Sequence, residues 1–181
     1  MMLLGWDINM FFSEFPTINY DTNGNGTTSE IQDILIRVII RDGIRERHSL
    51  FEEYDVKDWE IPESVSYEYY GSPQYHWVIM MTNKMFDRHY DWPLTERNLQ
   101  AYVLDKYDNP YATHHYEAAQ TSGDTNTKIW VDSTFTGATA VNNLEHERAL
   151  NDDKKQIKLL AQWYLARFLG EHSKLIYKLT P

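Results

Sequence analysis

The sequence contains no cysteine, which excludes disulfide bonds and every metal site that needs a thiolate ligand. A chain without cysteine fits a protein that is made and used in a reducing cytoplasm. No apolar run approaches the roughly 20 residues that a helix needs to cross a bilayer. The opening MMLLGW has neither a basic region nor a long apolar core, so we expect no signal peptide. The sequence therefore predicts no membrane partner.

Basic residues are also scarce, since 17 lysines and arginines stand against 27 acidic residues, for a net charge of −10. Phosphate repels an acidic chain, so we expect no nucleic acid as a partner. The charge serves solubility, or it complements basic neighbours in an assembly. Aromatic residues are plentiful instead, with 13 Tyr, 7 Phe and 6 Trp. Such a composition is typical of surfaces that are buried against other proteins.

Motifs for catalysis are missing from the sequence. There is no G-x-S-x-G, no H-E-x-x-H and no phosphate-binding glycine loop. The segment DTNGNG (21–26) matches half of a calcium loop, but Gln32 stands where a bidentate Glu is needed, so a turn is favoured. On a strand, His114-His115-x-Glu117 would place two possible ligands on one face, with no third in sight. We expect no enzyme activity, no metal and no cofactor.

The most informative stretch runs from Tyr54 to Asn83 and predicts a strand, a helix, a tight turn and a second helix. Alternation at 54–56 indicates the strand, and Pro62 suits the first turn of the helix at 63–70. Gly71 ends that helix, and the second helix spans 74–82. The residues expected to form the core and turns of this module are Val56, Val65, Tyr69, Gly71, Trp77, Val78 and Asn83.

This stretch resembles a LysM module, whose fold is a βααβ unit. The stretch contains Tyr70-Gly71-x-Pro73, Trp77-Val78-Ile79 and Asn83. In these residues it is similar to the LysM variant of phage tails rather than to the variant of cell-wall proteins. Four further segments follow the order of one family, namely 11–20 (FFSEFPTINY), 91–94 (DWPL), 106–107 (KY) and 147–160 (ERALNDDKKQIKLL). The chain thus resembles the baseplate wedge proteins of contractile-tailed (T4-like) phages, the product of gene 53 in the best-studied member. The likeness is weakest over 121–141.

Around this module we expect an α+β protein. Residues 1–48 would form an N-terminal arm and a helix, which capping boxes place from about 27 to 38. The LysM-like module would span 49–92, with its sheet completed by residues 112–132. An inserted helix would occupy 93–111, and 133–181 would hold a linker and a helical C-terminal region. One bent helix and two helices are both compatible with that region.

The resemblance implies a structural protein of the virion tail baseplate, assembled in the host cytoplasm. It would hold neighbouring wedges together around the hub, in six copies, with other wedge proteins and hub-proximal proteins as partners. Aromatic residues outside the module core are the candidates for binding these partners: Trp6, Phe11, Phe12, Phe15, Trp59, Tyr90 and Trp92. We expect the arm that carries the first four to leave its own module and to be buried by a neighbouring subunit.

The alternative function is carbohydrate binding, because other LysM proteins recognise peptidoglycan or chitin-like glycans. Cell-wall units carry Gly-Asp-Thr after the first strand, where small residues let a sugar approach the backbone. Here Lys57-Asp58-Trp59-Glu60 takes that place, and these side chains are bulky and charged. The chain also has a single unit, whereas weak glycan binders gain from repeats. We therefore favour the assembly protein.

Overall fold

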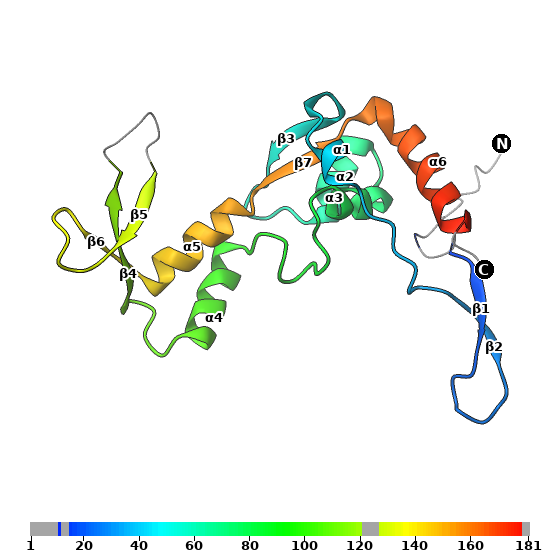
Figure 1. Ribbon diagram of the computed structural model, residues 1–181, viewed down its shortest axis with the longest axis horizontal. Coiled ribbons are helices and arrows are strands. Elements are labelled where there is room, and N and C mark those ends of the chain that lie inside the picture. Colours follow the sequence, from blue (N-terminus) through cyan, green and yellow to red (C-terminus); the bar gives the residue numbers. More distant parts are fainter. Residues whose placement is uncertain (1–10, 12–14, 121–126, 179–181) are drawn as a thin grey trace, which may run out of the picture. The chain divides into compact units, whose positions relative to one another are not determined.

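The computed structural model describes residues 11, 15–120 and 127–178, which form helices and small sheets of the expected α+β class. The elements follow in this order (Figure 1): β1 (Thr17–Tyr20), β2 (Ser29–Gln32), α1 (Asp42–Arg45), the 3-10 turn η2 (His48–Leu50), β3 (Phe51–Asp55), α2 (Pro62–Tyr70), the 3-10 turn η3 (Pro73–Tyr75), α3 (His76–Thr82), α4 (Glu96–Lys106), β4 (Thr113–Ala119), β5 (Lys128–Val131), β6 (Thr139–Asn142), α5 (Asn143–Asp153), β7 (Gln156–Leu160) and α6 (Gln162–Lys178).

The chain folds as two compact units. The first takes its described residues from 1–54, 61–86 and 158–181, and the second from 55–60 and 87–157. Among the described residues, no helix is both long enough and apolar enough to cross a bilayer.

A β-hairpin stands where the sequence predicted a helix over 27–38. Strands β1 and β2 pair antiparallel with Ile18 opposite Ile31, and Thr17 Oγ1 donates to Glu30 Oε1 at 2.6 Å. Glu30 was expected to close a capping box, but its carboxylate is used across the hairpin instead. The helix prediction is wrong because these local signals are outweighed by strand pairing.

The turn of this hairpin is organised by Asp21. Its carboxylate accepts hydrogen bonds from the backbone N–H groups of Asn23, Asn25 and Gly26 at 3.1, 3.2 and 2.7 Å. These N–H groups, led by that of Gly26, hold the pKa of Asp21 below its usual value. The DTNGNG segment is therefore a turn in which the aspartate caps its own loop, as its glycine and asparagine content indicated.

The predicted turn between two helices is confirmed at Gly71. Helix α2 begins at Pro62, and Gly71 follows its last residue in the left-handed conformation, with φ of 77°. The Ser72 side chain then accepts a hydrogen bond from the Gln74 N–H and starts the turn that leads into α3. Helices α2 and α3 fold back on each other as a result.

Strand β3 pairs with β7 in a two-stranded sheet. The Ala161 N–H donates to the Leu50 carbonyl and the Val56 N–H to the Lys155 carbonyl, both at 2.9 Å. The start of one strand thus meets the end of the other, so the strands run antiparallel. Along the chain, α2 and α3 follow β3, and α4, β4, β5, β6 and α5 come before β7.

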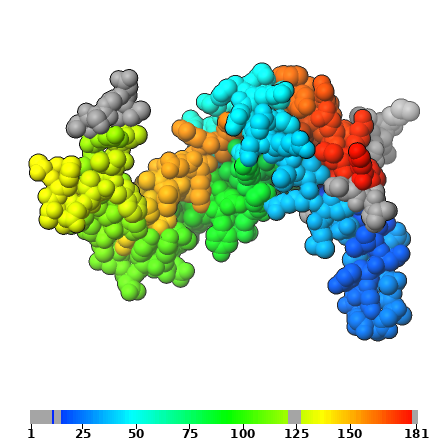
Figure 2. Space-filling view, in the orientation of Figure 1, coloured from blue at the N-terminus to red at the C-terminus, as the bar shows by residue number. Residues whose placement is uncertain are grey.

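The prediction that residues 112–132 complete this sheet is wrong. Strands β4 and β5 pair with each other, and β6 adds to the far side of β4. Tyr116 on the central strand lies opposite Val131 on one side and Ala140 on the other. Both edges of β4 are therefore occupied within the second unit. Figure 2 shows the turn between β5 and β6, in yellow, at the surface.

The C-terminal region contains a strand, β7, where the sequence predicts helix. Two helices, α5 and α6, are separated by β7, where Ile157 and Leu159 are buried and alternate with Gln156 and Lys158. This alternation has the period of a strand, and it was hidden in a pattern that also fits helical spacing. The expectation of an entirely helical region after the linker is wrong for β7, and β6 forms where the linker was expected to meet that region.

Candidate partner-binding surfaces

Three side chains tie the α2–α3 pair to β7 and the residues beside it. The Tyr70 hydroxyl donates to the Leu160 carbonyl at 2.9 Å, and the Gln162 amide donates to the Tyr69 carbonyl. Burial raises the pKa of the Tyr70 phenol well above its usual value. The Asn83 side chain bonds to the backbone of the strand from the end of α3. The position of the two helices on the sheet is therefore fixed by specific hydrogen bonds as well as by packing.

The predicted module core divides into buried and partly buried residues. Val56, Val65 and Val78 are buried, whereas Tyr69, Trp77 and Asn83 are partly buried. A cluster of Phe51, Val78 and Leu160 lies at the centre, and Trp77 packs against it from the side.

Within the first unit, Trp77 also contacts the N-terminal residue Phe11 and helix α6. Its ring centroid lies 4.7 Å from that of Phe11 and 4.6 Å from that of His172. Phe15 meets Phe11 edge to face, and only 7% of its surface is exposed. The expectation that the aromatic arm leaves its own module is thus wrong for Phe11 and Phe15. Trp6 and Phe12 lie outside the described residues.

The first unit carries an apolar groove of about 1260 Å³. One wall is the extended segment 34–42, and the other is α3 with the residues that follow it. Lys84 Nζ lies 2.6 Å from Asp42 Oδ1, and the Arg37 guanidinium lies 3.6 Å from the centre of the Phe86 ring. These two contacts join the walls. The apolar residues of the lining include Ile34, Leu35, Ile39, Met80, Met81 and Met85.

The other aromatic candidates lie in the second unit and differ in exposure. Trp59 is 73% exposed and Tyr90 is 70% exposed. Trp92 is 5% exposed, and its indole N–H donates to the Glu60 carbonyl at 2.9 Å. Trp92 is accordingly a core residue of its unit, whereas Trp59 and Tyr90 are accessible to a partner.

The turn after β3 is held together by interactions between the charged residues Lys57 and Glu60. Glu60 Oε2 accepts from the Lys57 backbone N–H at 2.9 Å, and Glu60 Oε1 lies 3.1 Å from Lys57 Nζ. The Asp58 carboxylate accepts from the Glu96 N–H at the start of α4. The Lys57 N–H of this turn and the Glu60 and Asp58 carboxylates are therefore engaged within the protein.

A buried carboxylate links α4 and α5. Glu147 Oε1 accepts from Lys106 Nζ and from the Tyr107 hydroxyl, each at 2.7 Å. Burial acts to raise the pKa of Glu147, but these two hydrogen bonds outweigh it and leave the pKa below its usual value. The glutamate is thus held as an anion that fixes one helix against the end of the other.

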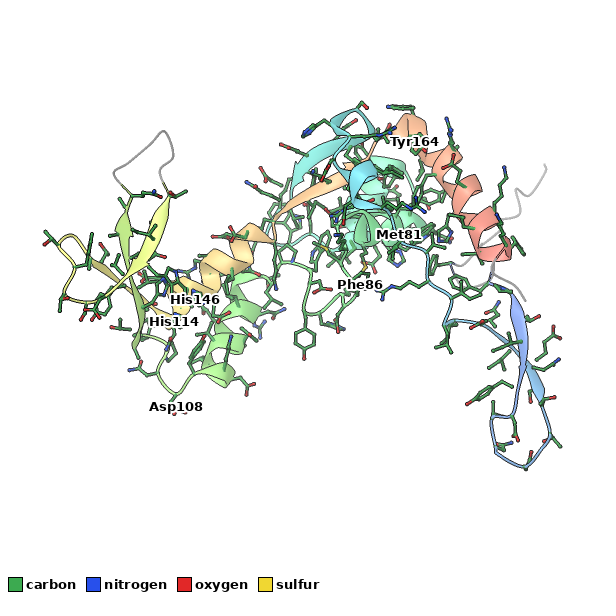
Figure 3. The ribbon with its side chains drawn as sticks, viewed as in Figure 1. Met81, Phe86, Asp108, His114, His146 and Tyr164 are labelled. Carbon is green, nitrogen blue, oxygen red and sulfur yellow. The ribbon has the colours of Figure 1, made fainter. Side chains whose placement is uncertain are left out.

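Three imidazoles meet between β4 and α5. The ring centroids of His114 and His146 lie 3.9 Å apart, and the Nδ1 atoms of His114 and His115 lie 2.9 Å apart (Figure 3). His115 Nε2 is 3.0 Å from Glu117 Oε1. The sequence indicates His114 and His115 as possible metal ligands but not His146, because no fixed spacing relates a residue of α5 to one of β4. The fold supplies the third side chain that the strand alone lacked.

Comparison with known proteins gives two matches. A family model described as base plate wedge protein 53 matches residues 10–131. The sequence is also 24% identical over 192 residues to the baseplate wedge protein gp53 of Enterobacteria phage T4. That alignment covers 93% of this chain and 97% of the T4 protein.

Proposed function

The chain belongs to the base plate wedge protein 53 family, and from this premise we propose that it holds neighbouring wedges together around the hub of a phage tail baseplate. The family makes it a structural protein of the virion baseplate. The finer part of the proposal is that the βααβ arrangement of β3, α2, α3 and β7 acts as a LysM-like protein–protein adapter. Its partners would be other wedge proteins and hub-proximal proteins, with six copies in each baseplate.

The observation that carries the proposal is the apolar groove of the first unit. A groove of about 1260 Å³ lined by isoleucine, leucine and methionine exceeds the roughly 300–1,000 Å³ of a small-molecule pocket, so it has room for a polypeptide segment. Leu35 is accessible to such a segment, because 86% of its surface is exposed although it lines the groove. Methionine-rich surfaces adapt to the shape of the segment that they bind. We assign the groove to an apolar segment of a neighbouring baseplate protein.

The glycan-binding alternative has less support. In the turn after β3, Glu60 closes on Lys57, and Asp58 accepts a backbone N–H from α4. A sugar would have to displace these bonds to reach the backbone. No observation in the described residues favours a glycan over a protein at this place.

The groove is tested by a matched pair of leucine substitutions. Leu35→Glu places a charge in the groove, whereas Leu104→Glu places one on α4, where the leucine is 67% exposed and does not line the groove. We expect L35E to lower the yield of joined wedges at least about tenfold and L104E to leave it unchanged, with both proteins folded by circular dichroism. Equal assembly by both variants would rule out the groove as the joining surface.

Two measurements separate the proposed function from its alternative. Quantitative mass spectrometry of purified tails should find the protein in multiples of six copies. Calorimetric titration with chitin oligomers or peptidoglycan fragments should give no dissociation constant at or below about 100 μM. Tight glycan binding together with absence from the tails would reverse the assignment.

A further inference from the structure

We propose that the second unit contains a binding site for a divalent transition-metal ion, formed by His114, His115 and His146. One ligand nitrogen from each of these side chains lies within 4.8 Å of the other two. The first two come from β4 and the third from α5, so an ion bound there would join the sheet to the helix. This inference is independent of the role proposed for the first unit.

His115 has the arrangement of a metal ligand in most detail. Its Nε2 lies 3.0 Å from Glu117 Oε1, while its Nδ1 faces His114. Metal-bound histidines commonly donate their second ring N–H to a carboxylate, which fixes the tautomer and turns the other nitrogen toward the ion. The Glu117 carboxylate is itself held by Lys128 Nζ at 3.1 Å. His115 is also buried, with its ring stacked on Trp130 at a centroid distance of 4.0 Å.

The facing nitrogens of His114 and His115 are placed to bind one cation in common. When Nε2 of His115 carries the proton that binds Glu117, its Nδ1 has a free lone pair directed at Nδ1 of His114, 2.9 Å away. With that tautomer, Nδ1 of His114 donates its proton to this lone pair in an ordinary hydrogen bond. A metal ion replaces that proton and is bound by both lone pairs. With bonds of 2.0–2.1 Å, tetrahedral ligand atoms lie about 3.3 Å apart, so small side-chain rotations suffice.

The third ligand comes from His146 in the first two turns of α5. Its ring is stacked on that of His114, with an angle of 14° between their planes. One nitrogen of His146 lies within 4.8 Å of a nitrogen of His114, and the two stacked rings must tilt apart for their in-plane lone pairs to converge on one ion. Figure 3 shows the two side chains next to each other at the base of the sheet.

The chemistry of the ligand set selects the kind of ion. Three imidazoles suit Zn²⁺, Co²⁺, Ni²⁺ or Cu²⁺, whereas Mg²⁺ and Ca²⁺ require oxygen ligands. Three protein ligands leave a fourth position for water, as in open zinc sites. We assign a stabilising role to the ion, because it would join two elements of the unit.

The test uses the full chain, stripped with a chelator and titrated with ZnCl₂ and CoCl₂. We expect one Zn²⁺ per chain with a dissociation constant of about 10 μM or lower, and a visible cobalt spectrum typical of four-coordinate Co²⁺. Saturating Zn²⁺ should raise the melting temperature by about 3 °C or more, since an ion that binds only the folded state stabilises it. Failure to bind at 1 mM ZnCl₂ would overturn the proposal.

Matched histidine substitutions locate the site. His115→Gln and His146→Gln should each weaken Zn²⁺ binding at least about tenfold, whereas His89→Gln changes an exposed histidine of the same unit and should have no effect. Binding that both ligand variants retain would place the ion elsewhere. If the variants unfold, long-range ¹⁵N NMR of the unmodified protein identifies the histidines that bind the ion. Of its 7 histidines, only these three should shift on Zn²⁺ addition, and shifts elsewhere alone would overturn the assignment.

Discussion

The side chain of Asn83 forms two hydrogen bonds with the backbone of Lys158, 75 residues later in the chain. Its Nδ2 donates to the Lys158 carbonyl and its Oδ1 accepts from the Lys158 N–H, each at 2.8 Å. The same Nδ2 donates to the Ile79 carbonyl at 2.8 Å. An amide thus occupies the place of a neighbouring strand beside β7 and fixes the end of α3 against the sheet.

Replacing Asn83 tests this connection. Asn83→Ala leaves both backbone groups of Lys158 without their partner, and such losses cost about 1–3 kcal/mol for each buried group. We expect the free energy of unfolding to fall by about 2–3 kcal/mol, measured by urea denaturation. Asn98→Ala removes an exposed asparagine side chain on α4 and should change stability by less than about 0.5 kcal/mol. Equal effects of the two substitutions would show that the amide contributes little.

Two glycines should respond to alanine with opposite signs. A Cβ would meet no atom within 4 Å at either Gly71 or Gly170, so crowding is not a factor. Gly71 has φ of 77°, where alanine is strained, and Gly71→Ala should destabilise by about 1 kcal/mol. Gly170 lies inside α6, and Gly170→Ala should stabilise by about 0.5–1 kcal/mol. Thermal unfolding of both variants gives the comparison, and a shared sign would contradict the conformational argument.

Alanine substitutions of two tryptophans in the second unit, one buried and one exposed, should differ in their effect on stability. Trp92→Ala removes a buried ring and the hydrogen bond to the Glu60 carbonyl, so we expect a loss of about 3–5 kcal/mol. Trp59→Ala should cost less than about 0.5 kcal/mol, because that ring is mostly exposed. Denaturant titration followed by far-UV circular dichroism measures both. Should Trp59→Ala also reduce wedge joining, the exposed ring would be part of a partner surface.

Removal of the Tyr70 hydroxyl group tests the contribution of the hydrogen bond between α2 and the end of β7. Tyr70→Phe keeps the ring but removes the donor to the buried Leu160 carbonyl, and we expect a loss of about 1–2 kcal/mol. Tyr67 is on the same helix and is largely exposed, so Tyr67→Phe should be close to neutral. Chemical denaturation of both variants provides the measurement. A neutral Tyr70→Phe would mean that water replaces the lost donor.

Local signals in the sequence predicted the helix pair well. Pro62 and Gly71 gave the bounds of α2 within a residue, because each acts through its own backbone geometry. The hairpin was missed, since Ile31, Ile34 and Leu35 have helical spacing but lie on a strand and along the groove wall. Apolar residues that line a groove outside a helix or strand need not be spaced with the period of either element.

Long-range pairing could not be predicted from local patterns. Strand β3 pairs with β7, and nothing near Phe51 indicates that its partner begins at Gln156. His146 was missed for the same reason, since its relation to His114 exists only after α5 packs beside β4. The candidate partner surface was likewise predicted from aromatic content, and this signal does not distinguish the buried Trp92 from the exposed Trp59.

The late position of β7 has a consequence for how the protein matures on the ribosome. Strand β3 is synthesised about one hundred residues before its partner, which takes on the order of 5–20 s at bacterial rates. During this time its edge is open to mispairing with other nascent chains. Val56, just after β3, and Lys155, just before β7, both belong to the second unit, where the Val56 N–H lies 2.9 Å from the Lys155 carbonyl. Once the second unit has folded, this hydrogen bond would leave a short loop to close between the two strands in place of one of about one hundred residues.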